Sequence, residues 1–321
     1  MSILLPSIAV IAGFAMLAWS ADRFVDGAAS IARHLNVSPM IIGLTIVSLC
    51  TSFPEMLVAA IAAYDGNSDL GIGNALGSNI ANIGLVLGVT ALIAPLTVHS
   101  MTFKRELPML FLVMLLALAL MLDGELGWID GVILLVGLVA MLWWLTRLGL
   151  QDRNDPLERE YSNEIPADMT MAASVTWFVV GLVILLLSSR VVVWGSVEIA
   201  HYFGISDLVI GLTIIAIGTS LPELMASIMS VKKGEDDLAI GNVIGSNMFN
   251  ILAVLSMPAL IASQPFAIEA LHRDFPIMIA FTVLMFLLVR SFRLKGKLGR
   301  IDGAILFTGF IGYLLLLYLQ S

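Results

Sequence analysis

Two glutamates lie inside long apolar stretches that hold almost no other charge. Glu55 ends the segment TSFPE, and Glu223 ends the related segment TSLPE. An ionisable side chain inside a membrane helix costs at least about 2.5–3.5 kcal/mol, so it usually serves a function there. A structural ion pair is the alternative, but the only bases well inside the apolar stretches, Arg23 and Arg190, are far from both motifs in sequence. The two carboxylates are therefore the first candidates for chemistry.

Oxygen-bearing residues surround each glutamate. Thr51 precedes Glu55 by four residues and Thr219 precedes Glu223 by four, so each pair shares one face of a helix. The same spacing recurs in three further pairs, which are Ser48 and Ser52, Ser78 and Asn82, and Ser246 and Asn250. Calcium takes about 6–8 oxygen ligands, whereas zinc prefers nitrogen and sulfur. Without a His or Cys cluster, the pattern favours a hard cation, and two glutamates would balance one divalent ion or part of the charge of several Na⁺.

Prolines next to the two glutamates predict helix kinks at the same depth. Pro54 and Pro222 have no amide hydrogen and clash with the preceding turn, so the carbonyls of Cys50 and Gly218 lose their usual donors. Irregular backbone at membrane depth is tolerated only where it lines a cavity or a site. We therefore expect the kinks to lie at the candidate site.

Small residues and histidines nearby have a different interpretation. Glycines four residues apart let membrane helices approach closely, so packing rather than ion binding is expected of Gly73, Gly77, Gly241 and Gly245. The four histidines are scattered near the ends of apolar stretches, and none is proposed as a ligand.

The composition indicates that these residues belong to a membrane protein. The chain has 321 residues, of which 59% are hydrophobic and 12% charged, whereas soluble domains are about 45–50% apolar and about 25% charged. Disordered chains are poor in apolar residues, which excludes that class. A net charge of −8 argues against nucleic-acid binding. The single cysteine, Cys50, excludes an internal disulfide and a cysteine-based metal centre.

Charges and turn residues divide the chain into ten apolar stretches, each near the length that a membrane helix needs. Their continuous hydrophobicity favours helices over barrel strands, which alternate. We expect an all-α polytopic membrane protein whose ten transmembrane helices lie at about 3–32, 39–63, 70–94, 105–122, 127–148, 170–200, 207–231, 238–262, 275–291 and 301–319. The first stretch lacks a basic leader and resembles 170–189, so we expect a helix rather than a signal peptide.

The chain repeats itself at an offset of 168 residues. Residues 42–55 match 210–223 at nine of fourteen positions, and 71–82 match 239–250 at seven of twelve. These matches predict a first five-helix repeat at 1–150, a cytoplasmic linker at 151–168, and a second repeat at 169–321. Five is an odd number, so the second repeat is expected to be inverted in the membrane, as in many secondary transporters whose sites lie at the midplane between repeats.

Basic residues predict the orientation. Thirteen of the sixteen Lys and Arg residues fall in alternate connections, beginning with the one after the first stretch. The positive-inside rule places those connections in the cytoplasm. Both termini are therefore expected outside the cytoplasm of a multi-pass plasma-membrane protein.

The segments GTSLPE (218–223), TSFPE (51–55), GNALGSNIAN and GNVIGSNMFN resemble the signature repeats of the calcium/cation antiporter superfamily, most closely its Na⁺/Ca²⁺ exchanger-like branch. The resemblance covers nearly the whole chain and implies a central site on the second, third, seventh and eighth spans. The GTS-x-PE form implies Na⁺ rather than H⁺ coupling. The resemblance to this branch also implies that the long first and sixth spans slide across the other helices, so that the site opens in turn to each side of the membrane.

The resemblance also implies roles for individual residues. Glu55 and Glu223 would be shared carboxylates, and the backbone carbonyls of Thr51 and Thr219 would bind Ca²⁺. Asn82 and Asn250 would line the middle of the site, and the flanking Na⁺ positions would draw on Ser48, Ser52, Ser78, Ala216, Ser220 and Ser246. The sequence departs from most relatives at Cys50, where glycine is usual, which implies a stiffer or thiol-sensitive first half. It departs from some relatives at Asn250, where an acid occurs, and this bears on the number of coupled ions and on any role of K⁺.

Secondary antiport of Ca²⁺ against Na⁺ is thus the expected function. We expect no catalytic residue, no resident cofactor and no obligatory protein partner; the expected partners are the two transported ions and the lipid bilayer. Exchange of another divalent cation and coupling to H⁺ remain open, as does, less favoured, a cation channel. An intramembrane enzyme is the weakest alternative because no nucleophile–base pair is visible.

Overall fold

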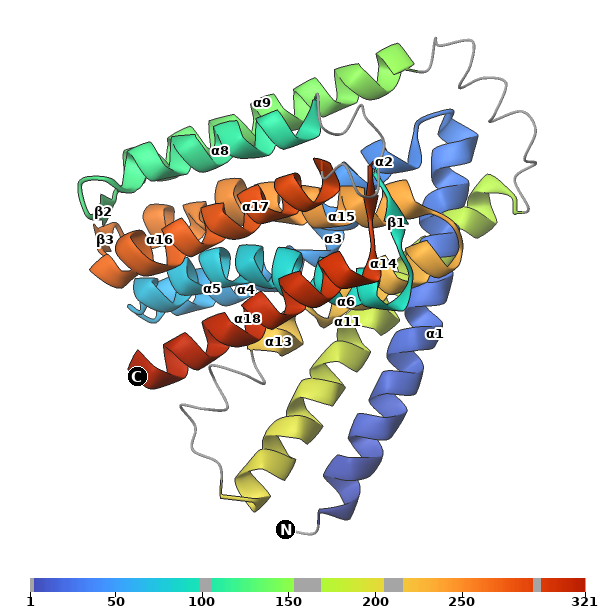
Figure 1. Cartoon of the computed structure of the whole chain (residues 1–321), viewed down its shortest axis with the longest axis horizontal. Helices are drawn as coiled ribbons and strands as arrows, with labels where there is room; N and C mark the ends of the chain where they lie inside the picture. The colour runs from blue at the N-terminus through green and yellow to red at the C-terminus, as the bar shows by residue number, and fades with distance from the viewer. Residues whose placement is uncertain (1–2, 99–104, 153–168, 205–215, 291–295, 321) are drawn as a thin grey trace.

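Helices make up nearly all of the computed structural model, which describes residues 3–98, 105–152, 169–204, 216–290 and 296–320 (Figure 1). Nearly all of the predicted linker, from residue 153 to 168, lies outside the described residues. The same holds for the beginning of the span expected from 207, and for the basic residues Lys104, Arg153, Arg159, Arg293 and Lys295.

The two longest helices pack against each other along their length. They are α1 (Leu4–Leu35) and α11 (Met171–Tyr202), each of 32 residues, and they cross the remaining helices at a steep angle (Figure 1). Glycines bring the backbones into contact: a Cβ on Gly27 would lie 2.5 Å from the Phe178 nitrogen, and one on Gly181 would lie 2.6 Å from the Phe24 nitrogen. Such close approach is typical of tightly associated membrane helices. We call these two helices the α1–α11 pair.

Two helices are broken next to the motif prolines. The first comprises α2 (Pro39–Ile42), the π-helical turn η1 (Gly43–Val47), α3 (Ser48–Thr51) and α4 (Phe53–Tyr64). Its two parts are bent by 41° at Ser52, which confirms the kink predicted beside Pro54. The second break separates α13 (Ala216–Thr219) from α14 (Leu221–Lys232) at Ser220, the position that corresponds to Ser52.

Two continuous helices occupy the centre. One consists of α5 (Ser68–Ala81), η2 (Asn82–Leu87) and α6 (Gly88–Ile93), and the other of α15 (Asp236–Phe249), η4 (Asn250–Val254) and α16 (Ser256–Ile261). Their most apolar stretches are 78% and 100% buried, against 28% for those of α1 and α11. Among the long helices of the described chain these two have the most buried apolar stretches, so they form the core that holds the broken helices.

Two of the four glycines expected to serve helix packing, Gly241 and Gly245, lie at a close contact between helices. A Cβ on Gly241 would lie 2.6 Å from the Met40 carbonyl oxygen, and one on Gly245 would lie 2.7 Å from the Leu44 carbonyl oxygen. The expectation is therefore confirmed where α15 meets the first broken helix. For Gly73 and Gly77 it stays a prediction, because the corresponding partners, residues 208–212, lie outside the described residues.

An outer layer of helices exposes large apolar side chains such as Leu112, Trp143 and Leu287. It contains α8 (Glu106–Met121), α9 (Trp128–Asp152), α17 (Phe275–Arg290), which follows the turn η5 (Ala270–Asp274), and α18 (Arg300–Gln320). Side chains of this kind are stable at such a surface when lipid tails rather than water surround it.

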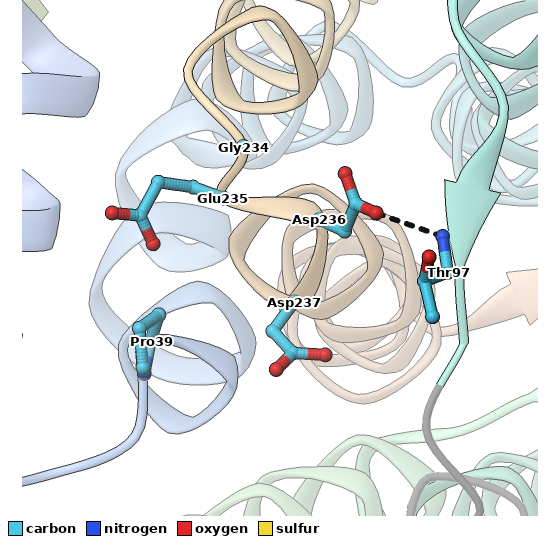
Figure 2. Close-up of a pocket in the computed structure, with 6 residues that line it drawn as sticks. All are labelled: Pro39, Thr97, Gly234, Glu235, Asp236 and Asp237. Atoms are coloured by element: carbon cyan, nitrogen blue, oxygen red, sulfur yellow. Dashed lines mark hydrogen bonds between the residues drawn. The ribbon is translucent and has the colours of Figure 1, made fainter. Parts of the chain in front are cut away.

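Two short sheets lie at opposite ends of these helices (Figure 1). At one end β1 (Leu96–Thr97) pairs antiparallel with β4 (Lys297–Leu298), and at the other β2 (Glu125–Leu126) pairs antiparallel with β3 (Gln264–Pro265). We call these the β1–β4 end and the β2–β3 end. The turn between α14 and α15 lies at the β1–β4 end, where the Asp236 carboxylate accepts a hydrogen bond from the Thr97 amide at 2.8 Å (Figure 2). The turn between α4 and α5 lies at the other end, since Asp69 accepts from the Ala267 amide at 2.7 Å.

Seven helices of the described chain are long and apolar enough to cross a membrane, or eight if the bent pair is counted as one span. The protein is therefore a helical membrane protein, as expected. The expected number of ten is not confirmed, because α8 is short and the segment that precedes α13 lies outside the described residues.

Candidate cation site

The two helix breaks position the two glutamates. Glu55 lies in the first turn of α4 and Glu223 in the first turn of α14, and their side chains are only 2% and 1% exposed. Helix N-termini carry partial positive charge, which favours carboxylates. The two carboxyl groups are close enough for their charges to interact. Thus two acids from distant parts of the sequence meet at one buried place.

No described base neutralises these acids. Neither carboxylate forms an ion pair with Lys, Arg or His in the described chain. Arg23 instead pairs with Asp26 at 3.8 Å and lies 5.2 Å from the centre of the Trp177 ring. The alternative of a structural ion pair is therefore excluded for the described residues, and no described basic side chain balances the charge of the two acids.

Buried oxygen atoms without hydrogen-bond partners gather on the expected site residues. One oxygen of each of the following side chains has less than 1 Å² exposed and makes no hydrogen bond: Ser52, Glu55, Asn82, Ser220, Glu223, Ser246 and Asn250. Leaving a buried polar group unsatisfied costs about 1–3 kcal/mol, and more for a charged one. Seven such atoms are a large cost unless a ligand pairs with them, and because all are oxygens they form a donor set that suits a hard cation.

Helices from both parts of the chain contribute to this group. Thr51 and Ser52, which flank the first helix break, lie beside the carboxyl group of Glu223 beyond the second break. The Asn82 amide donates to the Asn247 side chain at 3.1 Å, which joins the two central helices. Asn82 and Asn250 each begin a π-helical turn, a rare feature that occurs frequently at functional sites.

The other expected ligands have different surroundings. Ser48 is buried, but its hydroxyl donates to the Thr45 carbonyl at 3.3 Å, and Thr51 donates to the Ser48 carbonyl at 3.4 Å. Ser78 is 5% exposed. Thr219 is half-buried, and of Ala216 only the backbone is described. The hydroxyls of Ser48 and Thr51 are thus partly engaged with their own helix.

Two asparagines that the sequence reasoning did not select support the glutamates. The Asn74 amide donates to the Glu55 carbonyl at 3.1 Å, and the Asn242 amide donates to the Glu223 carbonyl at 3.3 Å. Asn242 also accepts from Thr51 at 3.3 Å and donates to Ser227 at 3.1 Å, so it connects the two broken helices. Both asparagines are the identical Asn of the aligned IGN segments, and that identity was the available signal.

The backbone at the second break has its own donor. The Ser189 hydroxyl of α11 donates to the Gly218 carbonyl at 3.0 Å and replaces the amide hydrogen that Pro222 lacks. The residue that corresponds to Ser189 in α1 is Ala21, and the Cys50 carbonyl receives no side-chain hydrogen bond from the described residues. The donor that each carbonyl is predicted to lose is therefore replaced by a side chain at Gly218, in the second half of the described chain.

The candidate site contains two carboxyl groups, those of Glu55 and Glu223, among neutral side chains. The described residues contain no group of three or more His, Cys, Asp or Glu side chains that could hold a metal ion. Carboxylate, hydroxyl and amide oxygens are the ligand types that hard cations prefer.

Comparison with known proteins identifies the class. Residues 6–147 and 173–319 match the model of the sodium/calcium exchanger protein family. Because these segments make up most of the chain, the protein belongs to that family, which consists of membrane transporters rather than enzymes.

Individual relatives agree with this assignment. The chain is 50% identical over 316 residues to a protein of Alkalimonas amylolytica that carries the name antiporter CaxA, with 98% of this chain and 99% of that protein covered. It is 28% identical over 350 residues to the sodium/calcium exchanger MaX1 of Methanosarcina acetivorans, covering 95% and 96%. The structure superposes on the sodium–calcium exchanger NCX_Mj, soaked without Na⁺ and Ca²⁺, with a TM-score of 0.83, 34% identity and coverage of 98% and 100%.

Proposed function

We propose that this protein exchanges Ca²⁺ for Na⁺ across the plasma membrane at the site between the two helix breaks. Seven unpartnered buried oxygens carry the proposal: one from each of the two carboxylates, and five from the hydroxyl and amide side chains around them. Membership of the sodium/calcium exchanger family supports the choice of ions.

Calcium binds in the proposal to the carboxylates of Glu55 and Glu223 and to the backbone carbonyls of Thr51 and Thr219. Sodium ions bind to overlapping positions formed by Ser48, Ser52, Ser78, Ala216, Ser220 and Ser246, and Asn82 and Asn250 line the middle. Because both ions need the same carboxylates, occupancy by one excludes the other. If the protein converts between its inward-facing and outward-facing forms only when an ion occupies the site, movement of Ca²⁺ in one direction is coupled to movement of Na⁺ in the other.

The membrane arrangement in this proposal has ten spans in two inverted repeats, 1–150 and 169–321, joined by the linker 151–168. The seven long apolar helices and the bent pair account for eight spans. The short apolar helix Glu106–Met121 supplies a ninth, and α13 with α14 belongs to a tenth. The β1–β4 end faces the cytoplasm, where most basic residues lie, and both termini face outward.

Radioactive Ca²⁺ uptake into proteoliposomes tests this function. An imposed Na⁺ gradient is expected to drive uptake, and removal of Na⁺ from the opposite side is expected to abolish it. A channel would continue to conduct Ca²⁺ without a counter-ion. Uptake that follows an imposed pH gradient and ignores Na⁺ would show coupling to H⁺ instead and would overturn the proposal.

A further inference from the structure

Ion pairs fasten α1 to the turn between α14 and α15 at the β1–β4 end. The Lys233 ammonium lies 2.8 Å from the Asp22 carboxylate and 2.6 Å from that of Asp26. Close by, Arg33 lies 3.0 Å from Glu235. Burial lowers the pKa of Lys233, but the hydrogen bonds and charges of the two aspartates outweigh it, so the pKa lies above its usual value. The turn therefore holds its positive charge against two acids of α1.

The offset of 168 residues transfers this contact to the other half of the chain with its charges reversed. Asp22 of α1 corresponds to Arg190 of α11, and Lys233 corresponds to Asp65 in the turn after α4. In the first pair the long helix carries the acid and the turn carries the base. In the second pair the long helix carries the base and the turn carries the acid. Both signs have changed together, so each pair remains complementary.

The second pair is not formed in this structure. Arg190 and Asp65 are both exposed, and neither makes an ion pair in the described chain. The packing is asymmetric in the same sense, because α1 packs against α14 whereas α11 has no comparable contact with α4. One pair is therefore joined at the β1–β4 end while its counterpart at the β2–β3 end is apart.

The two pairs are connected through the α1–α11 pair. Its helices meet at backbone distance at Gly27 and Gly181, and Ser30 and Ser174 share a hydrogen bond of 2.7 Å. Helices in such close contact move as one body more easily than they slide past each other. A movement that brings α11 onto α4 therefore takes α1 away from α14.

We propose that Asp22–Lys233 and Arg190–Asp65 are alternating ion pairs that fasten the α1–α11 pair in the two access states of the transporter. The structure has the first pair closed. In the opposite state the first pair opens and Arg190 reaches Asp65, so each state keeps one of the two repeat-related ion pairs. The inference rests on the proposed transport function, since it assigns these residues to the change of access.

Cross-linking tests the alternation without depending on the identity of the ions. The lone cysteine is first replaced (Cys50→Ala), and Asp22, Lys233, Asp65 and Arg190 are all changed to Cys. A short bifunctional thiol reagent is applied to the protein in liposomes, and the bridged peptides are identified by mass spectrometry. We expect some molecules bridged at the first pair and others at the second, but not both in one molecule. Double bridging, or bridging at the first pair only, would overturn the proposal.

A matched control shows whether bridging reflects mere mobility. Glu125 is an exposed acid in β2, at the same end as Asp65. A variant with Cys at Glu125 and Arg190 is expected to give no bridge. Bridging of this pair as readily as of Asp65 and Arg190 would contradict a specific contact.

Charge reversal tests the role of the second pair in exchange. Asp65→Lys places two cations together and is expected to slow ion exchange about two- to fivefold, the range for partly exposed pairs. Adding Arg190→Asp restores the attraction and is expected to restore the rate, whereas the control Glu125→Lys leaves it unchanged. An unaffected Asp65→Lys rate, or no recovery in the double variant, would overturn the proposal. Absence of exchange in the unaltered protein would instead refute the transport function and leave the cross-linking result to be judged alone.

Discussion

The unequal hydrogen bonding of Asn242 and Asn74 predicts unequal effects of two equivalent substitutions. Asn242 makes three side-chain hydrogen bonds, with Thr51, Ser227 and the Glu223 carbonyl, at 3.1–3.3 Å. Asn74 makes one, to the Glu55 carbonyl, at 3.1 Å. Side-chain hydrogen bonds within a membrane protein contribute about 0.6 kcal/mol each on average. Asn242→Ala is therefore expected to lower the free energy of unfolding by about 1.8 kcal/mol and Asn74→Ala by about 0.6 kcal/mol.

Asn242→Ala is also expected to weaken Ca²⁺ binding more than Asn74→Ala does. Asn242 holds Thr51 and the backbone of Glu223, both of which belong to the proposed site. If the lost hydrogen bonds are expressed fully in the bound geometry, Ca²⁺ affinity falls up to about 20-fold for Asn242→Ala and about threefold for Asn74→Ala. The difference arises because only Asn242 connects both broken helices.

Equilibrium unfolding in mixed micelles of detergent and SDS measures the first quantity, and calorimetric titration with Ca²⁺ measures the second. Asn67→Ala is a suitable control, because Asn67 accepts a hydrogen bond from the Leu70 amide at an exposed helix start away from the site. Equal effects of the two site substitutions, or a larger effect of Asn74→Ala, would refute the assignment of Asn242 as the link between the halves.

Three further predictions concern packing, backbone pairing and pH. Gly245→Ala places a methyl group against the Ser48 hydroxyl and 2.7 Å from the Leu44 carbonyl oxygen, so overpacking should cost about 1–3 kcal/mol of unfolding free energy. Gly312→Ala, which has open space around it, should cost less, and equal losses would contradict the packing. Ser189→Ala leaves the Gly218 carbonyl without its donor and should destabilise more than Ser188→Ala, whose hydroxyl bonds only to its own helix; the reverse order of unfolding energies would be inconsistent. Protons compete with Ca²⁺ for the site carboxylates, so uptake should fall from about pH 8 to about pH 5, and constant uptake over that range would refute the competition.

The sequence predicts the centre of the site because its chemistry is unusual in its surroundings. An acid within an apolar stretch is costly, so Glu55 and Glu223 could be selected without a structure, and the repeat indicated that they belong together. The adjacent prolines likewise predicted the kink at Ser52, since the missing amide hydrogen is a local property.

The supporting contacts could not be predicted in the same way. Which partner Asn242 selects depends on the side-chain directions of two helices that are separated in sequence by about 190 residues. The π-helical turns at Asn82 and Asn250 interrupt no apolar pattern, because all residues of both turns are buried. The difference between Ser189 and Ala21 was readable, but its effect depends on the position of α11 over the second break.

The asymmetry between the halves also exceeds what the repeat predicts. Two equivalent sequences suggest equivalent packing, yet α1 is fastened to α14 while α11 stands apart from α4. A transporter needs such a difference, because a single rigid structure can satisfy the contacts of only one access state at a time.

The most direct measurement of the central claim is Na⁺-gradient-driven Ca²⁺ uptake by Glu55→Gln and Glu223→Gln in proteoliposomes, with Glu125→Gln as the control. Each site substitution keeps the side-chain shape and removes one of the two buried charges. Loss of one partner from a buried charge pair costs about 2–5 kcal/mol, so uptake at limiting Ca²⁺ is expected to fall at least about 30-fold, while the control retains its uptake. Uptake that persists in either site variant at the level of Glu125→Gln would contradict the claim that these two carboxylates bind the transported ions.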